Sequence, residues 1–337
     1  MRVLHLIGVF FLYVPLLSTL AAGRSKTPTH HERSQSPGKI EQNRPKTTLF
    51  IGLPSDRRRK YHRMAARETW MRLAEQTEEV VTRFFVSHDG KDANVTGELH
   101  LENEEHGDMV ILGPDALGPG VEVLDGIPGV TQRMFILFEM AVTAFEPKYV
   151  ARIDDDSYVN IPVIMHMLAR NLSDRPFWFG YTIHGAQIDH RETDGLLLLK
   201  YQSYVDDLIH PPIVPQYMNG ALVIITASAV EALVAINNIV GLRMLWDDDV
   251  AIGLWLGGFD MKTLTPQEAG CIVKPYRPAD FGLVEWDDAP MTNFCLDAPL
   301  PYALVHPCKH PDIIRRVYDT AMDCEDPIAP GLPVAVR

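Results

Sequence analysis

The residues best suited to chemistry are three consecutive aspartates, Asp154-Asp155-Asp156, which directly follow the apolar run 149–153. Such a run predicts a buried strand, and α/β proteins bind ligands in the crevice beyond the carboxyl ends of their strands. Carboxylate oxygens suit Mg²⁺ or Mn²⁺. Three adjacent carboxylates repel one another unless a cation or hydrogen-bond donors compensate them. An isolated acidic triplet is more often a solvated turn, but the strand before it and residues 157–160 after it favour a metal site.

A second triplet, Asp247-Asp248-Asp249, stands where a helix is expected to begin. Helix capping explains only one of the three carboxylates. The functional alternative is a general base, a carboxylate near a cationic centre that accepts a proton from an alcohol. His306 follows the apolar run 303–305. A lone histidine is usually structural, but its imidazole could fill a metal position that two aspartates leave open.

Basic residues are concentrated between positions 57 and 72. The seven are Arg57, Arg58, Arg59, Lys60, Arg63, Arg67 and Arg72. They could offset the phosphates of a nucleotide, although a solvated helix face explains most of them. Arg67, beside Glu68-Thr69-Trp70, is the candidate for a specific role.

The elements that must position these residues alternate between strands and helices. Strands are expected at 47–53, 83–87, 108–112, 149–153 and 221–225. Pro54 should end the first strand, and Asp56 should cap a helix that runs to about Ala74. A Gly- and Pro-rich loop, 113–129, leads to a buried helix at 131–146 that Pro147 stops.

Two further helices are expected late in the chain. Ser228 and Glu231 form a capping box that starts a helix to about Ile236, and residues 246–250 begin another. Alternating strands and helices predict an α/β fold, a mixed sheet with helices on both faces. No internal repeat interrupts residues 47–337, so they form one predicted domain.

Composition is that of a globular protein, with 337 residues, 46% of them hydrophobic, and a formal net charge of −13. The negative charge is concentrated in residues 47–337, because residues 24–46 hold six basic and two acidic side chains. Such an acidic domain is a poor partner for nucleic acid, whose phosphates are bound by basic side chains. Residues 24–46 have almost no apolar content and indicate a flexible basic stem.

Residues 3–22 contain no Asp, Glu, Lys or Arg and are long enough to cross a bilayer. Residues 1–23 are therefore a signal anchor that spans the membrane or a cleaved signal peptide, and both interpretations send the chain into the secretory pathway. Asn94 and Asn171 lie in glycosylation sequons. The four cysteines, at 271, 295, 308 and 324, could form two disulfides in any of three pairings or remain buried thiols.

Several motifs occur in an order that resembles the Golgi β1,3-glycosyltransferases of the galactosyltransferase and fringe type, glycosyltransferase family 31. The family patterns are RxTW, GDII, NLTxK, KxDDDxFVN, KW, YPxYxxG and EDVYVG. The corresponding segments are Arg67–Trp70, Gly107–Val110, Thr131–Arg133, Lys148–Asn160, Lys200-Tyr201, Tyr217–Gly220 and Asp248–Gly253. The resemblance covers about Leu49 to Tyr318.

The resemblance implies a GT-A fold, a UDP-sugar donor, Mn²⁺ and inversion at the anomeric carbon. Asp156, Asp154 and His306 would hold the metal, and Asp249 would be the base, with Asp248 as the neighbouring catalytic candidate. Contacts with the donor would come from Ile51, Arg67, Arg133, Asp154, Asp155, Asn219 and Gly220. Lys200 and Tyr201 would lie in the acceptor region. The protein would be a single-pass type II Golgi membrane protein with a lumenal catalytic domain.

The expected activity is β1,3 transfer of galactose or N-acetylglucosamine from a UDP-sugar to a glycan acceptor of glycoproteins or glycolipids. Arg133 replaces a family lysine, and Asp248 stands where the family often has Glu, so the choice of sugar does not transfer from the family. The alternative is a noncatalytic secreted or anchored glycan-binding relative with the same fold, although such a module has no need for a base. A metal-dependent hydrolase would need more clustered ligands than the chain offers.

Overall fold

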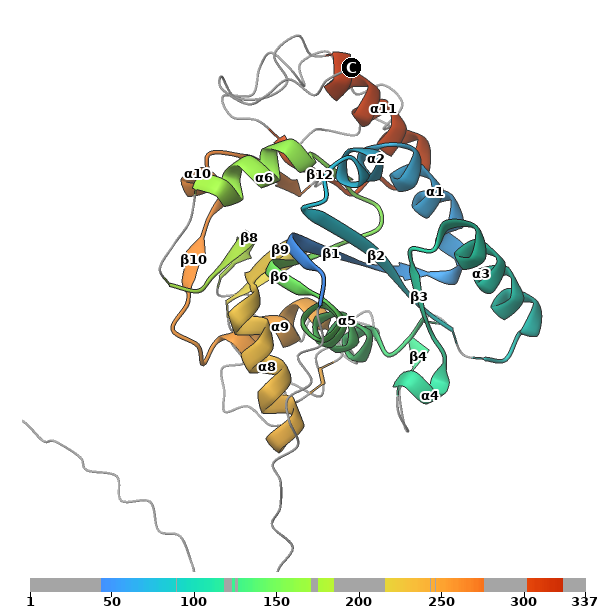
Figure 1. Ribbon diagram of the computed structural model, residues 1–337, viewed down its shortest axis with the longest axis horizontal. Coiled ribbons are helices and arrows are strands. Elements are labelled where there is room, and N and C mark those ends of the chain that lie inside the picture. Colours follow the sequence, from blue (N-terminus) through green and yellow to red (C-terminus); the bar gives the residue numbers. More distant parts are fainter. Residues whose placement is uncertain are drawn as a thin grey trace, which may run out of the picture. The chain divides into compact units, whose positions relative to one another are not determined.

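The computed structural model describes residues 44–88, 90–117, 123–124, 127–170, 175–184, 216–242, 244–245, 247–275 and 302–323. Within them, seven strands form one mixed sheet in the order β10-β8-β9-β6-β1-β2-β3 (Figure 1). Their bounds are β1 Lys46–Asp56, β2 Val80–Ser87, β3 Met109–Leu112, β6 Glu146–Ile153, β8 Phe177–Ile183, β9 Tyr217–Thr226 and β10 Lys262–Leu264. β6, β1, β2 and β3 are mutually parallel, and β9 runs antiparallel to both β6 and β8.

Two small sheets accompany the large one. β11 (Ile272–Pro275), β12 (Tyr302–His306) and β7 (Tyr158–Val159) form the first, in which β12 runs antiparallel to β7. β4 (Val123–Leu124) and β5 (Ile127–Pro128) form the second. Because only Ser157 separates the first acidic triplet from β7, the pairing of β7 with β12 brings the end of β12 to that triplet.

Helices cover both faces of the large sheet (Figure 1). One face carries α1 Lys60–Glu68, α2 Trp70–Glu75, α6 Ile161–Arg170 and α11 Pro311–Asp323, and the other carries α5 Val130–Ala144, α8 Ala227–Val240 and α9 Asp248–Leu256. The remaining helices are η1 Arg57–Arg59, α3 Ala93–His106, α4 Pro114–Leu117 and α10 Pro266–Ala269. This architecture confirms the predicted α/β class.

The hydrophobic core lies on both sides of the sheet because side chains alternate along each strand. In β1, Leu49 and Ile51 pack into the cluster that includes Trp70, whereas Phe50 packs into the opposite cluster with Phe138. All five side chains are fully buried. Because the central strands are buried on both faces, the carboxyl ends of β1 and β6 are held in place, and these ends carry the site.

Asp56 caps the first expected helix as predicted, since its Oδ1 accepts a hydrogen bond from the Arg58 backbone at 2.8 Å, but the first turn is the 3₁₀ helix η1 and α1 starts only at Lys60. The helix does not continue unbroken to Ala74. Thr69 has non-helical backbone angles, and its hydroxyl donates to Ala65 O at 2.6 Å, so α1 and α2 are separate helices. β1 also runs through Pro54. The strand pairs with β6 only as far as Gly52, so the proline removes no ladder hydrogen bond on that side.

Three other boundaries differ from expectation. α5 ends at Ala144, and Pro147 lies inside β6 rather than stopping the helix. The predicted capping box is wrong: α8 begins at Ala227, so Ser228 lies within its first turn. Thr226 precedes the helix, but its hydroxyl bonds to Phe177 O at 3.1 Å rather than capping it. Helices α3 and α6 and strand β8 were not predicted.

Several sequence features fall partly or wholly outside the described residues. Residues 1–43, Asn171, Lys200, Tyr201, Cys295 and Cys324 are among them. Cys271 and Cys308 are buried free thiols, so neither takes part in a disulfide in this structure. Asn94 is exposed in the first turn of α3, and its glycosylation stays a prediction. In the part of the chain described, no helix is both long and apolar enough to cross a bilayer.

Candidate active site

The first acidic triplet begins immediately after β6, at the carboxyl end of a strand that pairs with β1 on one side and β9 on the other. Asp155 and Asp156 are buried, and 30% of the Asp154 side chain is exposed. The indole of Trp70 donates to Ser157 O at 3.1 Å and thereby ties the backbone after the triplet to α2. The fold therefore presents the three carboxylates at the edge of the sheet where ligands of α/β proteins bind.

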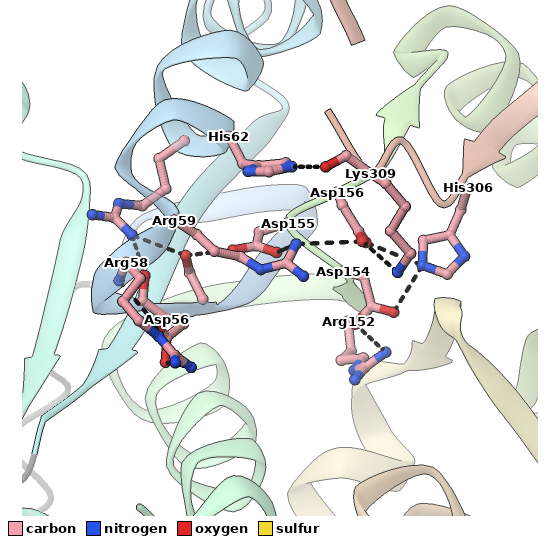
Figure 2. Close-up of polar contacts among 12 residues, drawn as sticks. Asp56, Arg58, Arg59, His62, Arg152, Asp154, Asp155, Asp156, His306 and Lys309 are labelled. Carbon is pink, nitrogen blue, oxygen red and sulfur yellow. Dashed lines mark hydrogen bonds and ion pairs between the residues drawn. The ribbon is translucent and has the colours of Figure 1, made fainter. Parts of the chain in front are cut away.

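His306 lies between two of these carboxylates (Figure 2). Its Nε2 is 3.2 Å from Asp154 Oδ2 and 3.1 Å from Asp156 Oδ1. The three possible ligand atoms lie within 4.8 Å of one another. Two carboxylates and an imidazole are a donor set suited to Mn²⁺ and related divalent cations, so these residues fit the predicted metal. His306 follows Asp156 by 150 positions in the sequence, and the pairing of β7 with β12 brings it to the two aspartates.

The pKa values of the three side chains in this cluster are shifted from their usual values. Burial disfavours a charged His306, but hydrogen bonds and the charges of Asp154 and Asp156 outweigh it and raise the His306 pKa to about 9. Burial likewise opposes ionisation of Asp156, yet His306, Lys309 and Arg59 hold its pKa below the usual range. The Asp154 pKa is also lowered, by Arg152 and His306 against the effect of burial. Both carboxylates are thus ionised, the form in which they bind a cation.

Two further cations flank the triplet. Arg59 Nη1 lies 3.0 Å from Asp155 Oδ1 and 3.3 Å from Asp156 Oδ2, and Lys309 Nζ lies 3.2 Å from Asp156 Oδ2 (Figure 2). Their side chains are 35% and 64% exposed, so both can reach a ligand in solvent. Asp155 differs from its neighbours, because burial raises its pKa to about 6 although Arg59 and a 2.6 Å hydrogen bond from Ser55 oppose this.

The three aspartates of the second triplet make different contacts. Asp247 caps α9, accepting from the backbone of Asp249 at 3.1 Å, so capping uses one of the three carboxylates. Asp248 Oδ2 pairs with Arg152 Nη2 at 2.8 Å. Asp249 Oδ2 accepts from Gly220 N at 2.8 Å, but its buried Oδ1 has no hydrogen-bond partner among the described residues. Burial, reinforced by neighbouring aspartates, holds the Asp249 pKa well above its usual value despite Arg152.

Two donor-binding candidates already have close contacts within the protein. Ile51 is fully buried in the core beside β2 and β6, and its contact with a donor stays a prediction. Arg67 is 8% exposed, makes two 2.8 Å bonds to Asp108 and one to Glu102, and stacks over Phe84 at 5.0 Å. These two carboxylates hold the Arg67 guanidinium, and its contact with a diphosphate stays a prediction.

Arg133, Asn219 and Gly220 lie closer to the triplets. Arg133 is buried on α5, and its Nη1 donates to Ser55 O at 2.7 Å, at the carboxyl end of β1. Asn219 and Gly220 are in β9, and Asn219 Oδ1 accepts from Ala221 N at 3.1 Å. Their contacts with a donor stay predictions. Lys200 and Tyr201 lie outside the described residues.

Sequence reasoning missed two cationic residues of this site, Arg152 and Lys309. Each has a weak signal in the sequence, since Arg152 precedes Asp154 by two positions and Lys309 follows His306 by three. Residues two apart on a strand share a face. No local sequence pattern indicates that Arg152 also forms a hydrogen bond with Asp248, which lies 96 positions further along the chain.

A family model described as galactosyltransferase matches residues 61–267. A hydroxyproline O-galactosyltransferase of Arabidopsis thaliana, GALT5, is 27% identical over 218 residues, which are 64% of this chain and 30% of that protein. The plant's probable beta-1,3-galactosyltransferase 8 is 22% identical over 325 residues, 92% of this chain and 74% of that protein. A solved active-site mutant of LgtC has a TM-score of 0.40 at 15% identity, covering 81% of this chain and 95% of that one. The matched segment thus spans less than a third of GALT5.

Proposed function

Because this chain belongs to the galactosyltransferase family, we propose that it transfers a hexose from a UDP-sugar to a glycan acceptor of glycoproteins or glycolipids. The proposed hexose is galactose or N-acetylglucosamine, the linkage is β1,3, and the anomeric carbon is inverted. The names of the Arabidopsis relatives, which specify galactosyl transfer and in part β1,3 linkage, support galactose as the first donor to test. The proposed location is the Golgi lumen, with residues 3–22 as the anchor.

One observation supports this function above the others, the shared arginine between the two acidic triplets. Arg152 Nη1 lies 2.9 Å from Asp154 Oδ1, in the metal-binding set, while its Nη2 pairs with Asp248 and its Nη1 lies 3.6 Å from Asp249 Oδ1. The proposed cation site and a carboxylate with a raised pKa are therefore immediate neighbours. Sugar transfer needs both a place for a charged leaving group and a base for the acceptor hydroxyl.

Asp249 is the proposed base. It would take the proton of an acceptor hydroxyl while that oxygen forms a bond to the anomeric carbon of the donor. The bond from this carbon to the diphosphate oxygen breaks at the same time, and UDP leaves on the opposite face. A raised pKa makes the ionised Asp249 a stronger base than an ordinary carboxylate. A module that only binds glycans would gain nothing from this buried carboxylate.

Asp154, Asp156 and His306 are the proposed holders of Mn²⁺, which supplies Lewis-acid stabilisation of the leaving diphosphate when bound. Arg59 and Lys309 are the proposed diphosphate contacts, because each is partly exposed and already lies beside Asp156. Their charges would offset part of the negative charge that develops on UDP.

The decisive experiment is a transfer assay on the purified full chain with UDP-galactose and UDP-N-acetylglucosamine, β-linked acceptors, and either Mn²⁺ or a chelator. We expect Mn²⁺-dependent transfer with one donor. Asp249→Asn should lower kcat by about 10²- to 10⁴-fold, the usual contribution of general base catalysis, while UDP binding persists. Asp260→Asn, at a side chain that is 90% exposed, is the matched control and should leave kcat unchanged. Absence of transfer with every donor, or transfer indifferent to chelator, would refute the proposal.

A further inference from the structure

Arg152 occupies an unusual position for a charged side chain. It is the penultimate residue of β6, its side chain is 7% exposed, and three aspartates surround its guanidinium. A guanidinium keeps its positive charge in proteins at any ordinary pH. The side chain is therefore a permanent buried cation between the two acidic triplets.

The contacts of Arg152 use the forked shape of a guanidinium. Nη1 donates to Gly220 O and pairs with Asp154 Oδ1, whereas Nη2 bonds to Asp248 Oδ2 at 2.8 Å. A lysine ammonium is a single point of charge and cannot place separate nitrogens on carboxylates that lie in different directions. The arginine thereby fixes the end of β6 relative to the start of α9.

Gly220 completes the arrangement from β9. Its N–H holds Asp249 Oδ2 and its carbonyl accepts from Arg152, so one peptide segment clamps both side chains. A Cβ at this position would overlap the Arg152 guanidinium and lie 2.5 Å from Asp249 Oδ1. Only glycine permits this close approach. The clamp leaves Oδ1 of Asp249 without a hydrogen-bond partner among the described residues, on the same side as Arg152.

We propose that Arg152 is a positioning residue that fixes the Asp249 carboxylate, relative to the metal-binding carboxylates, in the orientation needed for proton abstraction. This inference rests on the proposed sugar transfer and names a residue that acts through Asp249 without touching the substrates. Arg152 is not needed to hold the cation, since its own positive charge opposes a cation at Asp154. Loss of Arg152 should therefore separate metal binding from turnover.

The test compares Arg152→Met and Arg152→Lys in the full chain, with Arg175→Met at a 60% exposed arginine as the matched control. Mn²⁺ affinity is measured without donor by electron paramagnetic resonance, and kcat and donor KM are measured with the donor that wild type uses. We expect Arg152→Met to bind Mn²⁺ at least as tightly as wild type and to lose at least 100-fold in kcat. Arg152→Lys should recover part of that loss, because it restores the charge without the fork. The control should match wild type in both measurements.

A kcat within threefold of wild type in Arg152→Met would overturn the proposal. Parallel loss of Mn²⁺ binding and kcat would also overturn it, because a general structural role disturbs both. If Arg152→Met does not fold, Arg152→Lys decides: full Mn²⁺ binding with at least a tenfold loss of kcat supports the positioning role, and unchanged kcat refutes it. Failure of the proposed function is a different outcome, in which wild type itself shows no transfer.

Discussion

The buried ion pair between Arg63 and Glu102 allows a quantitative test of how this fold supports its site. Arg63 Nη2 lies 2.7 Å from Glu102 Oε2, and the two side chains are 0% and 2% exposed. Arg63 Nη1 also donates to Ser55 Oγ at 3.0 Å and to Asp56 O at 2.7 Å. Since Ser55 in turn bonds to Asp155, this pair links α3 to the carboxyl end of β1 and the first triplet.

The change Arg63→Met removes the charge while keeping much of the side-chain volume. Breaking a buried ion pair by removing one partner costs about 3–5 kcal/mol, because the other charge remains buried. Arg67 Nη1 would still contact Glu102 Oε1 at 2.8 Å, so the lower end of the range applies, about 3 kcal/mol. At about 2–4 °C for each kcal/mol, the midpoint of thermal unfolding should fall by roughly 6–12 °C.

The chain offers a matched control at the same distance. Arg315 Nε lies 2.7 Å from Glu68 Oε2, but these side chains are 33% and 45% exposed. Arg315→Met should therefore cost less than about 1 kcal/mol, as is usual for exposed pairs. Urea unfolding followed by circular dichroism measures both losses. Equal losses in the two variants, or a loss below about 1 kcal/mol in Arg63→Met, would refute the reasoning that burial, rather than distance, decides the effect.

Three further predictions concern the site. Because burial raises the Asp249 pKa and the base must be ionised, kcat should increase as pH rises through that pKa, and the acidic limb should lie above pH ~4, where an ordinary aspartate titrates. A kcat that stays flat down to pH ~4.5 at saturating substrates would contradict this. In chelator, His306 has a pKa of about 9, against 6.5 for an ordinary histidine. This difference implies that its protonation adds about 3 kcal/mol to the free energy of unfolding. The contribution is complete below pH 6.5 and disappears as pH rises through about 9. Urea unfolding at both ends of this pH range should show the loss in wild type and not in His306→Gln. Lys309→Met should weaken UDP binding by about tenfold in titration calorimetry, the value of one charge-assisted contact, and unchanged affinity would exclude the lysine from the diphosphate site.

The sequence was sufficient to predict the central strands and the first triplet, because both depend on local patterns. An apolar run followed by acidic residues determines that β6 is buried and that Asp154 lies at its end. His306 was a candidate because it follows the apolar run 303–305 and because the family resemblance implies a metal ligand there. Its position at the end of β12 is consistent with that prediction, but only the pairing of β12 with β7 shows that its ring lies between Asp154 and Asp156.

The errors arose where a distant partner outweighs a local signal. Ser228 and Glu231 have the spacing of a capping box, yet β9 continues to Thr226 and α8 starts before the serine. Contacts between distant positions are equally hidden, since Arg67 bonds to Asp108, 41 positions away. A side chain's partner across the fold decides its role, and no spacing within one element reveals it.

The contacts of the acidic triplets show which cations offset their negative charge. Crowded aspartates need a cation or hydrogen-bond donors to compensate them, and the protein itself supplies Arg152, Arg59 and Lys309. Repulsion alone therefore does not require a metal. The stronger indication is that His306 lies between two ionised carboxylates, which raise its pKa to about 9, so that its ring carries a proton at neutral pH. Binding of a divalent ion there would have to release that proton, so metal affinity should increase with pH.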